Sequence, residues 1–402
     1  MIHVCFGIHD KTGHYSKFTG TAILSLFENT KSKVTVHILH DNTLTQDNRD
    51  KFSRLAERYN QLVKFYNVEE LCAAKIVEYI NIVPSIKNSR VSVGAFYRLL
   101  ISQILSPDIE KIIYFDSDII VNLDIVELWQ FELGEKILGV VTISDIGGNL
   151  HCDKIYLEGY IKTEDYFNSG VLLMNLKLLR NEEETLLEGL RFRREHSSDF
   201  FDQPILNYCF STRTLKLSAR FNKFVWCARR ENETFADKKI YHYTGGGRCQ
   251  LDMRDPFNRL WMSYFIKTPW FDENSIGRLY EGVQRLHVEL KAAMVQLSAL
   301  MSGKARAFFA LPQDIEMLKI FFAMRDDEEV ILAETEQSLR ELIDAMRRSR
   351  GKKVFFIMVA NFPFNMLIQA GFVYGKDFLN GLEFLSEANG MPLNSYELIK
   401  AM

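Results

Sequence analysis

The stretch KIIYFDSDIIV, from Lys111 to Val121, decides how the first part of this 402-residue chain folds. Its first apolar run has the length and composition of a buried β-strand, and it ends abruptly at two acids separated by one residue. A second apolar run follows at once. Because two carboxylates are costly to bury without a counter-ion, the pattern predicts a strand end that offers Asp116 and Asp118 to a divalent cation.

Strand-like and helix-like segments alternate in the residues that precede this stretch. Such alternation predicts a mainly parallel sheet covered by helices. Ligands of such sheets bind beyond the carboxyl ends of the strands, which is where the two acids stand. The predicted strands are His3–Ile8, Lys33–His40 and Leu62–Tyr66, and the predicted helices are Thr19–Glu28, Gln46–Tyr59 and Ser92–Ile104.

The composition is that of a soluble globular protein, with 47% hydrophobic and 25% charged residues. A formal net charge of −3 gives no global attraction to nucleic acid, so we exclude that class of partner. The six cysteines form no C-x-x-C pair, which argues against zinc clusters and fits a reducing compartment. The N-terminal residues lack the features of a secretory signal, which predicts a cytoplasmic protein.

The apolar stretch from Val354 to Tyr374 is nearly as long as a membrane span and follows a basic run. Polar residues and a proline interrupt it at Asn361, Pro363, Asn365 and Gln369. We therefore expect a buried strand at Lys353–Val359, a turn at Asn361–Pro363 and then a helix, rather than a span.

The pattern changes near residue 273, which predicts a domain at residues 1–272 and two further segments. Apolar residues recur at alternating spacings of three and four from Ile276 to Leu300, until Gly303 ends the pattern. This predicts a long amphipathic helix at 273–303, which either packs on its own chain or forms a homodimer through 276–300. Residues 304–402 show a βαβαβα rhythm typical of a small Rossmann-like α/β domain. They lack a G-x-G-x-x-G motif and a Walker lysine loop, and their role is not readable.

A second signal lies at YHYTGGGR, residues 241–248, after a predicted strand. A neutral His242 is a suitable metal ligand, and three glycines let backbone N–H groups approach phosphate oxygens. Arg248 could neutralise a diphosphate. Alone, this segment would be interpreted as a flexible glycine turn beside a satisfied histidine, and a lone D-x-D is also common in turns. Together the two signals predict a metal–diphosphate site.

Six segments, in this order along residues 1 to about 270, resemble motifs of family 8 glycosyltransferases. That group includes glycogenin and bacterial lipopolysaccharide galactosyl- and glucosyltransferases. The segments are residues 92–99 with Arg98, the D-x-D pair, Val140–Asp145, YFNSGVLL at 166–173, FDQPILN at 201–207 and the H-x-x-G motif at His242–Gly245.

The resemblance implies a GT-A-type mononucleotide-binding domain that moves glucose or galactose from a UDP-sugar with retention of anomeric configuration. It implies Mn²⁺, with Mg²⁺ as the alternative, bound by Asp116, Asp118 and His242. Catalytic roles would fall to Gln203, Asp202, Asn168 and Asp145, with Gln203 steadying the cationic sugar during same-face attack. Donor contacts would come from Asp10, Tyr15, Arg98, Asp116, Ser117, Gly245, Gly246, Gly247 and Arg248.

The chain departs from the family pattern at two places. Arg248 stands where the family has lysine, which keeps the charge but changes its shape. The donor loop after the first strand reads HDKTGHY, residues 9–15, where the family has D-D-N-Y.

Several of these residues also have simpler structural readings. Asn168 could cap a turn, Asp202 could cap the helix that begins near Pro204, and Arg98 could form a surface ion pair. Asp145 could serve the turn at the end of a strand.

The acceptor is not readable. A glycan or glycolipid would suit cell-envelope polysaccharide or lipopolysaccharide synthesis, and the basic segments Arg191–Arg194 and Arg347–Lys353 would suit peripheral contact with the inner face of the membrane. Solvated helix faces explain those basic segments equally well. The rival functions are a metal-dependent nucleotidyltransferase and a catalytically weak nucleotide-sugar-binding scaffold.

Overall fold

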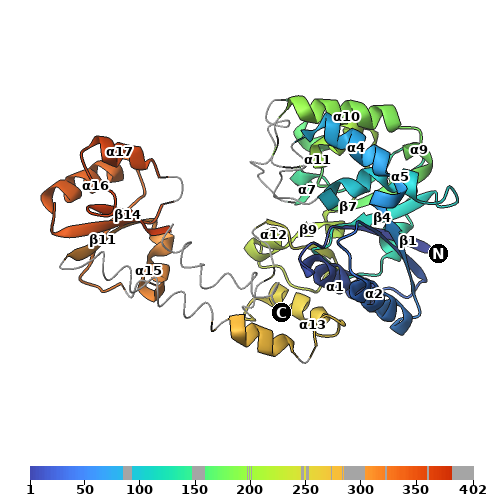
Figure 1. Cartoon of the computed structure of the whole chain (residues 1–402), viewed down its shortest axis with the longest axis horizontal. Helices are drawn as coiled ribbons and strands as arrows, with labels where there is room; N and C mark the ends of the chain where they lie inside the picture. The colour runs from blue at the N-terminus through green and yellow to red at the C-terminus, as the bar shows by residue number, and fades with distance from the viewer. Residues whose placement is uncertain are drawn as a thin grey trace. The chain divides into compact units, whose positions relative to one another are not determined.

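The computed structural model divides the chain into two compact units, Met1–Asn274 and Ser275–Met402 (Figure 1). It describes residues 1–84, 93–146, 159–196, 202–245, 253–272, 274–282, 304–321, 324–359 and 362–382, with residues 198, 200, 249 and 284. Each unit is described by itself below.

A seven-stranded mixed sheet forms the centre of the first unit, in the order β3-β2-β1-β4-β7-β6-β8. The first four of these strands are mutually parallel, β7 is antiparallel to both β4 and β6, and β8 is parallel to β6. The strands are β1 (Ile2–Ile8), β2 (Val34–His40), β3 (Leu62–Asn67), β4 (Lys111–Phe115), β6 (Leu138–Val140), β7 (Val171–Asn175) and β8 (Thr214–Lys216).

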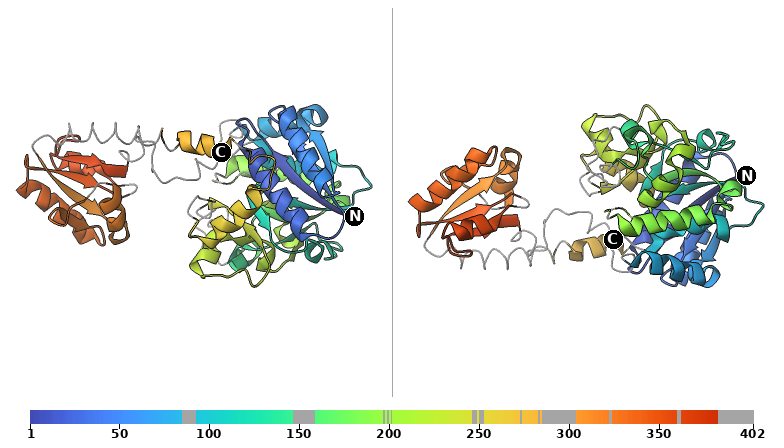
Figure 2. Two further views of the ribbon diagram at one scale, coloured as in Figure 1. Left: turned by 90° about the horizontal axis from the view of Figure 1, so that it is seen from below. Right: turned by 90° about the horizontal axis from the view of Figure 1, so that it is seen from above.

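Helices cover both faces of this sheet, which is why β2 is buried along its whole length. The layer that contains α1 and α2 lies in front when the molecule is seen from below, and α10 lies in front from above (Figure 2). The helices are α1 (His14–Asn29), α2 (Gln46–Arg58), α3 (Val68–Leu71), α4 (Ala73–Ile82), α5 (Ile101–Ile104), α6 (Val126–Trp129), α7 (Ile143–Ile146), α9 (Leu176–Leu179), α10 (Glu183–Glu195), α11 (Gln203–Phe210), α12 (Val225–Arg230) and α13 (Pro256–Phe265).

A smaller sheet, in the order β5-β10-β9, joins distant parts of the chain. Its strands are β5 (Ile119–Val121), β9 (Lys223–Phe224) and β10 (Ile240–His242). Because β10 runs antiparallel to β5 with His242 opposite Ile119, the histidine is brought beside the two acids that precede β5.

The second unit has a four-stranded parallel sheet, in the order β12-β11-β13-β14. Helices α16 and α17 pack on one face through Leu342 and Leu367, and α15 packs on the other through Leu318. The elements are β11 (Ala305–Ala310), α15 (Ile315–Phe321), β12 (Glu329–Leu332), α16 (Glu336–Arg348), β13 (Lys353–Ile357), α17 (Phe364–Gln369) and β14 (Phe378–Asn380).

The expected strand and helix between Lys353 and Ala370 are confirmed as β13 and α17, whereas the turn expected at Asn361–Pro363 begins outside the described residues and stays a prediction. In the described part of the chain, no helix is both long and apolar enough to cross a membrane. Residues 275–282 of the predicted long helix are helical, and most of the rest of it lies outside the described residues.

The helix predicted at Ser92–Ile104 is present from Val93 onward, but most of it is not an α-helix. The segment is a 3₁₀-helix, η2 (Val93–Leu100), followed by the short α5. Neighbouring side chains of η2 are fixed at different strand ends, since Tyr97 reaches Asp41 after β2 and Arg98 reaches Asp116 after β4. These tertiary contacts override the helical spacing of the apolar residues.

Candidate metal and donor site

The acidic pair lies at the carboxyl end of β4, as its sequence predicts. Asp116, Asp118 and His242 place ligand atoms within 4.8 Å of one another. The Nε2 atom of His242 is 3.2 Å from Asp118 Oδ1 and 3.9 Å from Asp116 Oδ2. Strand β4 supplies one acid and the turn into β5 the other, while β10 supplies the histidine.

Asn222 fixes the orientation of the His242 ring. The side-chain oxygen of Asn222 is 2.9 Å from His242 Nδ1, and an amide oxygen only accepts, so Nδ1 carries the hydrogen. This directs Nε2 toward the two acids, as is usual for a metal-binding histidine. Burial alone would lower the pKa of His242, but Asp118 and Asp116 outweigh burial and raise it. A bound divalent cation would take the place of that proton.

Gly170 closes the site from the side of β7. A Cβ atom at this position would lie 2.3 Å from His242 Cε1 and 2.8 Å from Asp116 Oδ2, so the backbone is as close as a residue without a side chain allows. The Asp116 N–H donates to the Gly170 carbonyl at 2.8 Å, which holds the two segments together. Two carboxylates and one imidazole with a bare Nε2 fit a divalent cation such as Mn²⁺.

A chain of amide hydrogen bonds leads from the histidine to α11. Asn222 Nδ2 donates to Asn168 Oδ1 at 2.8 Å, and Asn168 Nδ2 donates to Gln203 Oε1 at 2.9 Å. Gln203 Nε2 then donates to the hydroxyl of Tyr166 at 3.1 Å. The structure thus brings Asn168 and Gln203 next to the metal ligands. Asn168 also accepts from the Gly170 N–H at 3.0 Å. The alternative in which Asn168 caps a turn before β7 is therefore also confirmed.

Arg98 joins Asp116 to Asp202. It donates to Asp116 Oδ1 at 2.7 Å, and its Nε lies 3.0 Å from Asp202 Oδ2. Arg98 also donates to the Ser169 carbonyl at 2.6 Å and lies over the Tyr114 ring at 4.3 Å. Arg98 therefore does form ion pairs, but it is buried and not on the surface as the alternative supposed, and its contact with a donor stays a prediction. Burial raises the pKa of Asp202, and the Arg98 charge opposes that rise.

Asp202 occupies the N-cap position of α11, but its side chain makes no capping hydrogen bond there. The alternative predicts the N-cap position correctly, but the Asp202 carboxylate does not cap the helix. The carboxylate faces Arg98 instead, which links α11 to Asp116.

Comparison with known proteins assigns this site to a family. Residues 8–248 match Glycosyl transferase family 8, which is more than half of the chain. The chain belongs to this family.

Among family relatives, a putative glycosyltransferase of Haemophilus influenzae is 28% identical over 52% of this chain and 60% of its own length. The chain thus spans less than two thirds of that relative. A lipopolysaccharide 1,2-glucosyltransferase of Escherichia coli is 26% identical over 60% of this chain and 67% of its own length. General stress protein A of Bacillus subtilis is 22% identical over 66% of this chain and 93% of its own length.

The fold is that of solved GT-A glycosyltransferases. The galactosyltransferase LgtC, crystallised with donor and acceptor sugar analogues, has a TM-score of 0.53 and 20% identity over 69% of this chain and 99% of its own. The predicted fold class of this family 8 chain, α/β with a mixed and mainly parallel sheet, is therefore confirmed.

The remaining predicted donor residues stand at the same edge of the sheet or outside the described residues. Thr19 of α1 donates to Ser117 Oγ at 2.8 Å, and the exposed Tyr15 lies one turn earlier on that helix. Asp10 is buried, and its carboxylate accepts from the Tyr15 N–H, from Ser16 and from Asn48. Its uridine contact stays a prediction, since these bonds give it a structural task. Gly245 is described, whereas Gly246, Gly247 and Arg248 lie outside the described residues.

The expectation that Asp145 ends a strand is wrong, because β6 stops at Val140 and Asp145 lies in the short helix α7. Its exposed carboxylate accepts from Thr142 at 2.6 Å. Its proposed place at the sugar stays a prediction.

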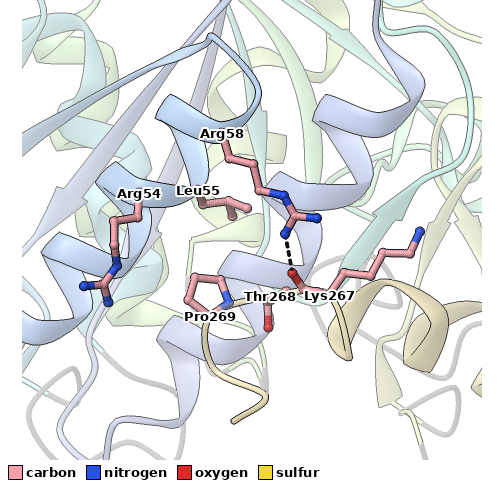
Figure 3. Close-up of a pocket in the computed structure, with 6 residues that line it drawn as sticks. All are labelled: Arg54, Leu55, Arg58, Lys267, Thr268 and Pro269. Carbon is pink, nitrogen blue, oxygen red and sulfur yellow. Dashed lines mark hydrogen bonds between the residues drawn. The ribbon is translucent and has the colours of Figure 1, made fainter.

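A cavity of about 280 Å³ lies elsewhere, lined by Arg54, Leu55, Arg58, Lys267, Thr268 and Pro269 (Figure 3). Arg58 donates to the Lys267 carbonyl at 3.0 Å, and the Lys267 ammonium pairs with Glu28 at 2.8 Å. Figure 3 shows the Arg54 and Lys267 side chains pointing away from each other, so their charges do not converge on one ligand. None of the predicted site residues lines this cavity, and we do not assign the donor to it.

Proposed function

We propose that this chain is a retaining glycosyltransferase that moves glucose or galactose from a UDP-sugar to a glycan or glycolipid, with Mn²⁺ or Mg²⁺. The observation that carries the proposal is the cluster of Asp116, Asp118 and His242, with Asn222 directing the histidine toward the acids. This cluster stands at the carboxyl edge of a parallel sheet, where nucleotides bind in such folds.

In this proposal, Asp116, Asp118 and His242 hold the cation, which supplies positive charge to the diphosphate as UDP leaves. Asp116 keeps one oxygen for Arg98 and turns the other toward the histidine, so the acid is fixed before the donor arrives. The backbone amides at 245–247 and the side chain of Arg248 would share the charge of the diphosphate.

The sugar would lie toward Asn168 and Gln203. As the glycosidic bond breaks, the sugar gains oxocarbenium character, and the buried amide of Gln203 is oriented by Asn168, Tyr166 and the Ser169 N–H. An amide is a poor nucleophile. We therefore assign Gln203 to steadying the cation while the acceptor attacks from the face that UDP leaves.

The relative named as lipopolysaccharide 1,2-glucosyltransferase supports a role in envelope polysaccharide or lipopolysaccharide synthesis. A cytoplasmic location with peripheral membrane contact, and a homodimer through 276–300, remain predictions.

The test is release of UDP from a panel of UDP-sugars, first with Mn²⁺ and then with EDTA. We expect slow hydrolysis of one donor, which EDTA abolishes and added Mn²⁺ restores. The donor that is cleaved names the sugar. UDP binding without turnover of any donor would favour the scaffold, and release of pyrophosphate from a nucleoside triphosphate would favour the nucleotidyltransferase.

A further inference from the structure

Four aromatic rings gather at the surface where the end of α10 lies against α11. The Phe192 ring stacks on His196 and on Tyr208, with a centroid distance of 4.1 Å to each and interplanar angles of 23° and 13°. Two rings this close to a third cannot share one of its faces, so Phe192 lies between them. Tyr160 stands nearly perpendicular to Phe192 and to His196, at 5.2 and 4.7 Å. We call these four residues the ring stack.

Hydrogen bonds hold the ring stack in place. His196 Nδ1 lies 3.0 Å from the Phe192 carbonyl, which only accepts, so Nδ1 carries the hydrogen. In the neutral ring Nε2 is then an acceptor, and the Tyr160 hydroxyl donates to it at 3.0 Å. The buried Arg193 donates to the His196 carbonyl at 3.0 Å and to two further carbonyls before α11. Because the rings are ordered in advance, a ligand that stacks on them loses less of its binding energy to ordering.

Two members of the ring stack are open to solvent. Tyr208 is 43% exposed and Tyr160 is 54% exposed, whereas Phe192 is buried. Since Phe192 covers one face of the Tyr208 ring, the exposed part of that ring includes its other face. The neighbouring Arg191 and Arg194 of α10 are charged and exposed. The centre of a protein interface is depleted of charge, whereas a flat ring with charged and hydroxyl groups around it suits a sugar.

The ring stack lies close to the position proposed for the transferred sugar. Helix α10 packs beside α11 (Figure 1), and Tyr208 and Gln203 are both on α11, about 7.5 Å apart along its axis. Helical side chains incline toward the start of their helix, so Tyr208 inclines toward the end that carries Gln203. Tyr160 lies shortly before Tyr166, whose hydroxyl accepts from Gln203. Both exposed tyrosines therefore belong to segments that lead into the surroundings of Gln203.

We infer that Tyr208, backed by Phe192, is a subsite for an oligosaccharide acceptor. A pyranose unit remote from the reacting hydroxyl stacks its C–H groups on the open, electron-rich face of the Tyr208 ring, and Tyr160 flanks it. The inference rests on the proposed function, because it takes the acceptor to react beside Gln203. It narrows the acceptor to a chain of several sugar units, since a single sugar cannot lie at Gln203 and on Tyr208 at once.

The experiment measures binding of the full chain to immobilised mono-, di- and tetrasaccharides of glucose and of galactose, with UDP and Mn²⁺ present, for the wild type and Tyr208→Ala. We expect the wild type to bind at least one tetrasaccharide about 10-fold more tightly than its monosaccharide, and Tyr208→Ala to lose that gain. The inference fails if the wild type favours no tetrasaccharide, or if Tyr208→Ala keeps the full gain.

Two further variants separate stacking from folding. Tyr208→Phe keeps the ring that packs on Phe192 and removes only the hydroxyl, so the gain should persist. Tyr208→Leu keeps an apolar side chain without a flat ring, so the gain should disappear from a folded protein. The opposite result in either variant would overturn the stacking role.

UDP affinity with Mn²⁺, measured by calorimetry on the same proteins, tells the two failures apart. We expect the same affinity in the wild type and in all three variants, because Tyr208 is not part of the metal and donor site. If the wild type binds no UDP, the proposed function fails and the assignment of Tyr208 to an acceptor fails with it. If the wild type binds UDP but gains nothing from the longer glycan, only the inference fails.

Discussion

Gly170→Ala is expected to reduce turnover by about 100-fold or more, because the added methyl group would fill the metal site. Its Cβ would lie 2.3 Å from His242 Cε1, so either the histidine or the strand must move. Since Asn222 holds the ring from the other side, displacement of His242 breaks the ligand set. The measurement is UDP release at saturating Mn²⁺, together with the Mn²⁺ concentration needed for half-maximal rate.

The matched control is Gly277→Ala, at a helical position where an added Cβ meets nothing within 4 Å. It should keep wild-type turnover. A folded Gly170→Ala protein with wild-type turnover and metal requirement would show that the cation binds elsewhere.

Gln203→Ala is expected to lower turnover by about 100- to 1,000-fold and to leave UDP binding unchanged. The substitution removes the amide that faces the proposed sugar position, while Asp116, Asp118 and His242 keep their ligand atoms. It also leaves Asn168 Nδ2 and the Ser169 N–H without their shared acceptor, so unfolding should be followed in parallel. Single-turnover kinetics measure the rate of transfer, and calorimetry measures the affinity for UDP. The two measurements separate an effect on catalysis from an effect on binding.

Tyr166→Phe serves as the companion variant, because it removes only the hydroxyl that accepts from Gln203 Nε2. We expect a loss of less than about 10-fold, since Oε1 keeps both of its donors. Equal losses in the two variants would mean that the Tyr166 hydroxyl matters as much as the Gln203 amide, which would contradict the role assigned to Oε1. Wild-type turnover in Gln203→Ala would remove Gln203 from the mechanism.

The cluster of candidate metal ligands could be predicted from sequence because each of its residues stands at the end of a locally recognisable strand. Asp116 and Asp118 follow an apolar run, and His242 ends one. The residues that orient them give no such signal. Asn222 reaches His242 only because β9 pairs with β10, a contact that joins positions 20 residues apart.

The partners of Arg98 also cannot be predicted from the sequence. Its presence near the site follows from the family resemblance, but its partners depend on how β4, β7 and α11 meet. Asp116, the Ser169 carbonyl and Asp202 come from three separate segments, and the guanidinium contacts all three. Likewise, Asp41 after β2 contacts both His9 after β1 and the Tyr97 hydroxyl of η2. Because these residues come from different elements, the contacts are visible only in the folded chain.

In the second unit, periodicity predicts β11, α15, β12, α16, β13 and α17 in the correct order. The last strand, β14, spans only Phe378–Asn380, which is too short for a periodic signal. Apolar side chains of this unit cover both faces of its sheet. Their periodicity therefore predicts how the unit packs and does not predict a catalytic or binding site.

The most direct test of the central claim is the affinity of the wild-type chain for UDP with Mn²⁺ and with EDTA, measured by calorimetry beside Asp118→Ala. We expect UDP binding that is at least about 10-fold tighter with Mn²⁺, and no such gain in Asp118→Ala. Equal UDP affinity with Mn²⁺ and with EDTA in the wild type would contradict a metal–diphosphate site at Asp116, Asp118 and His242.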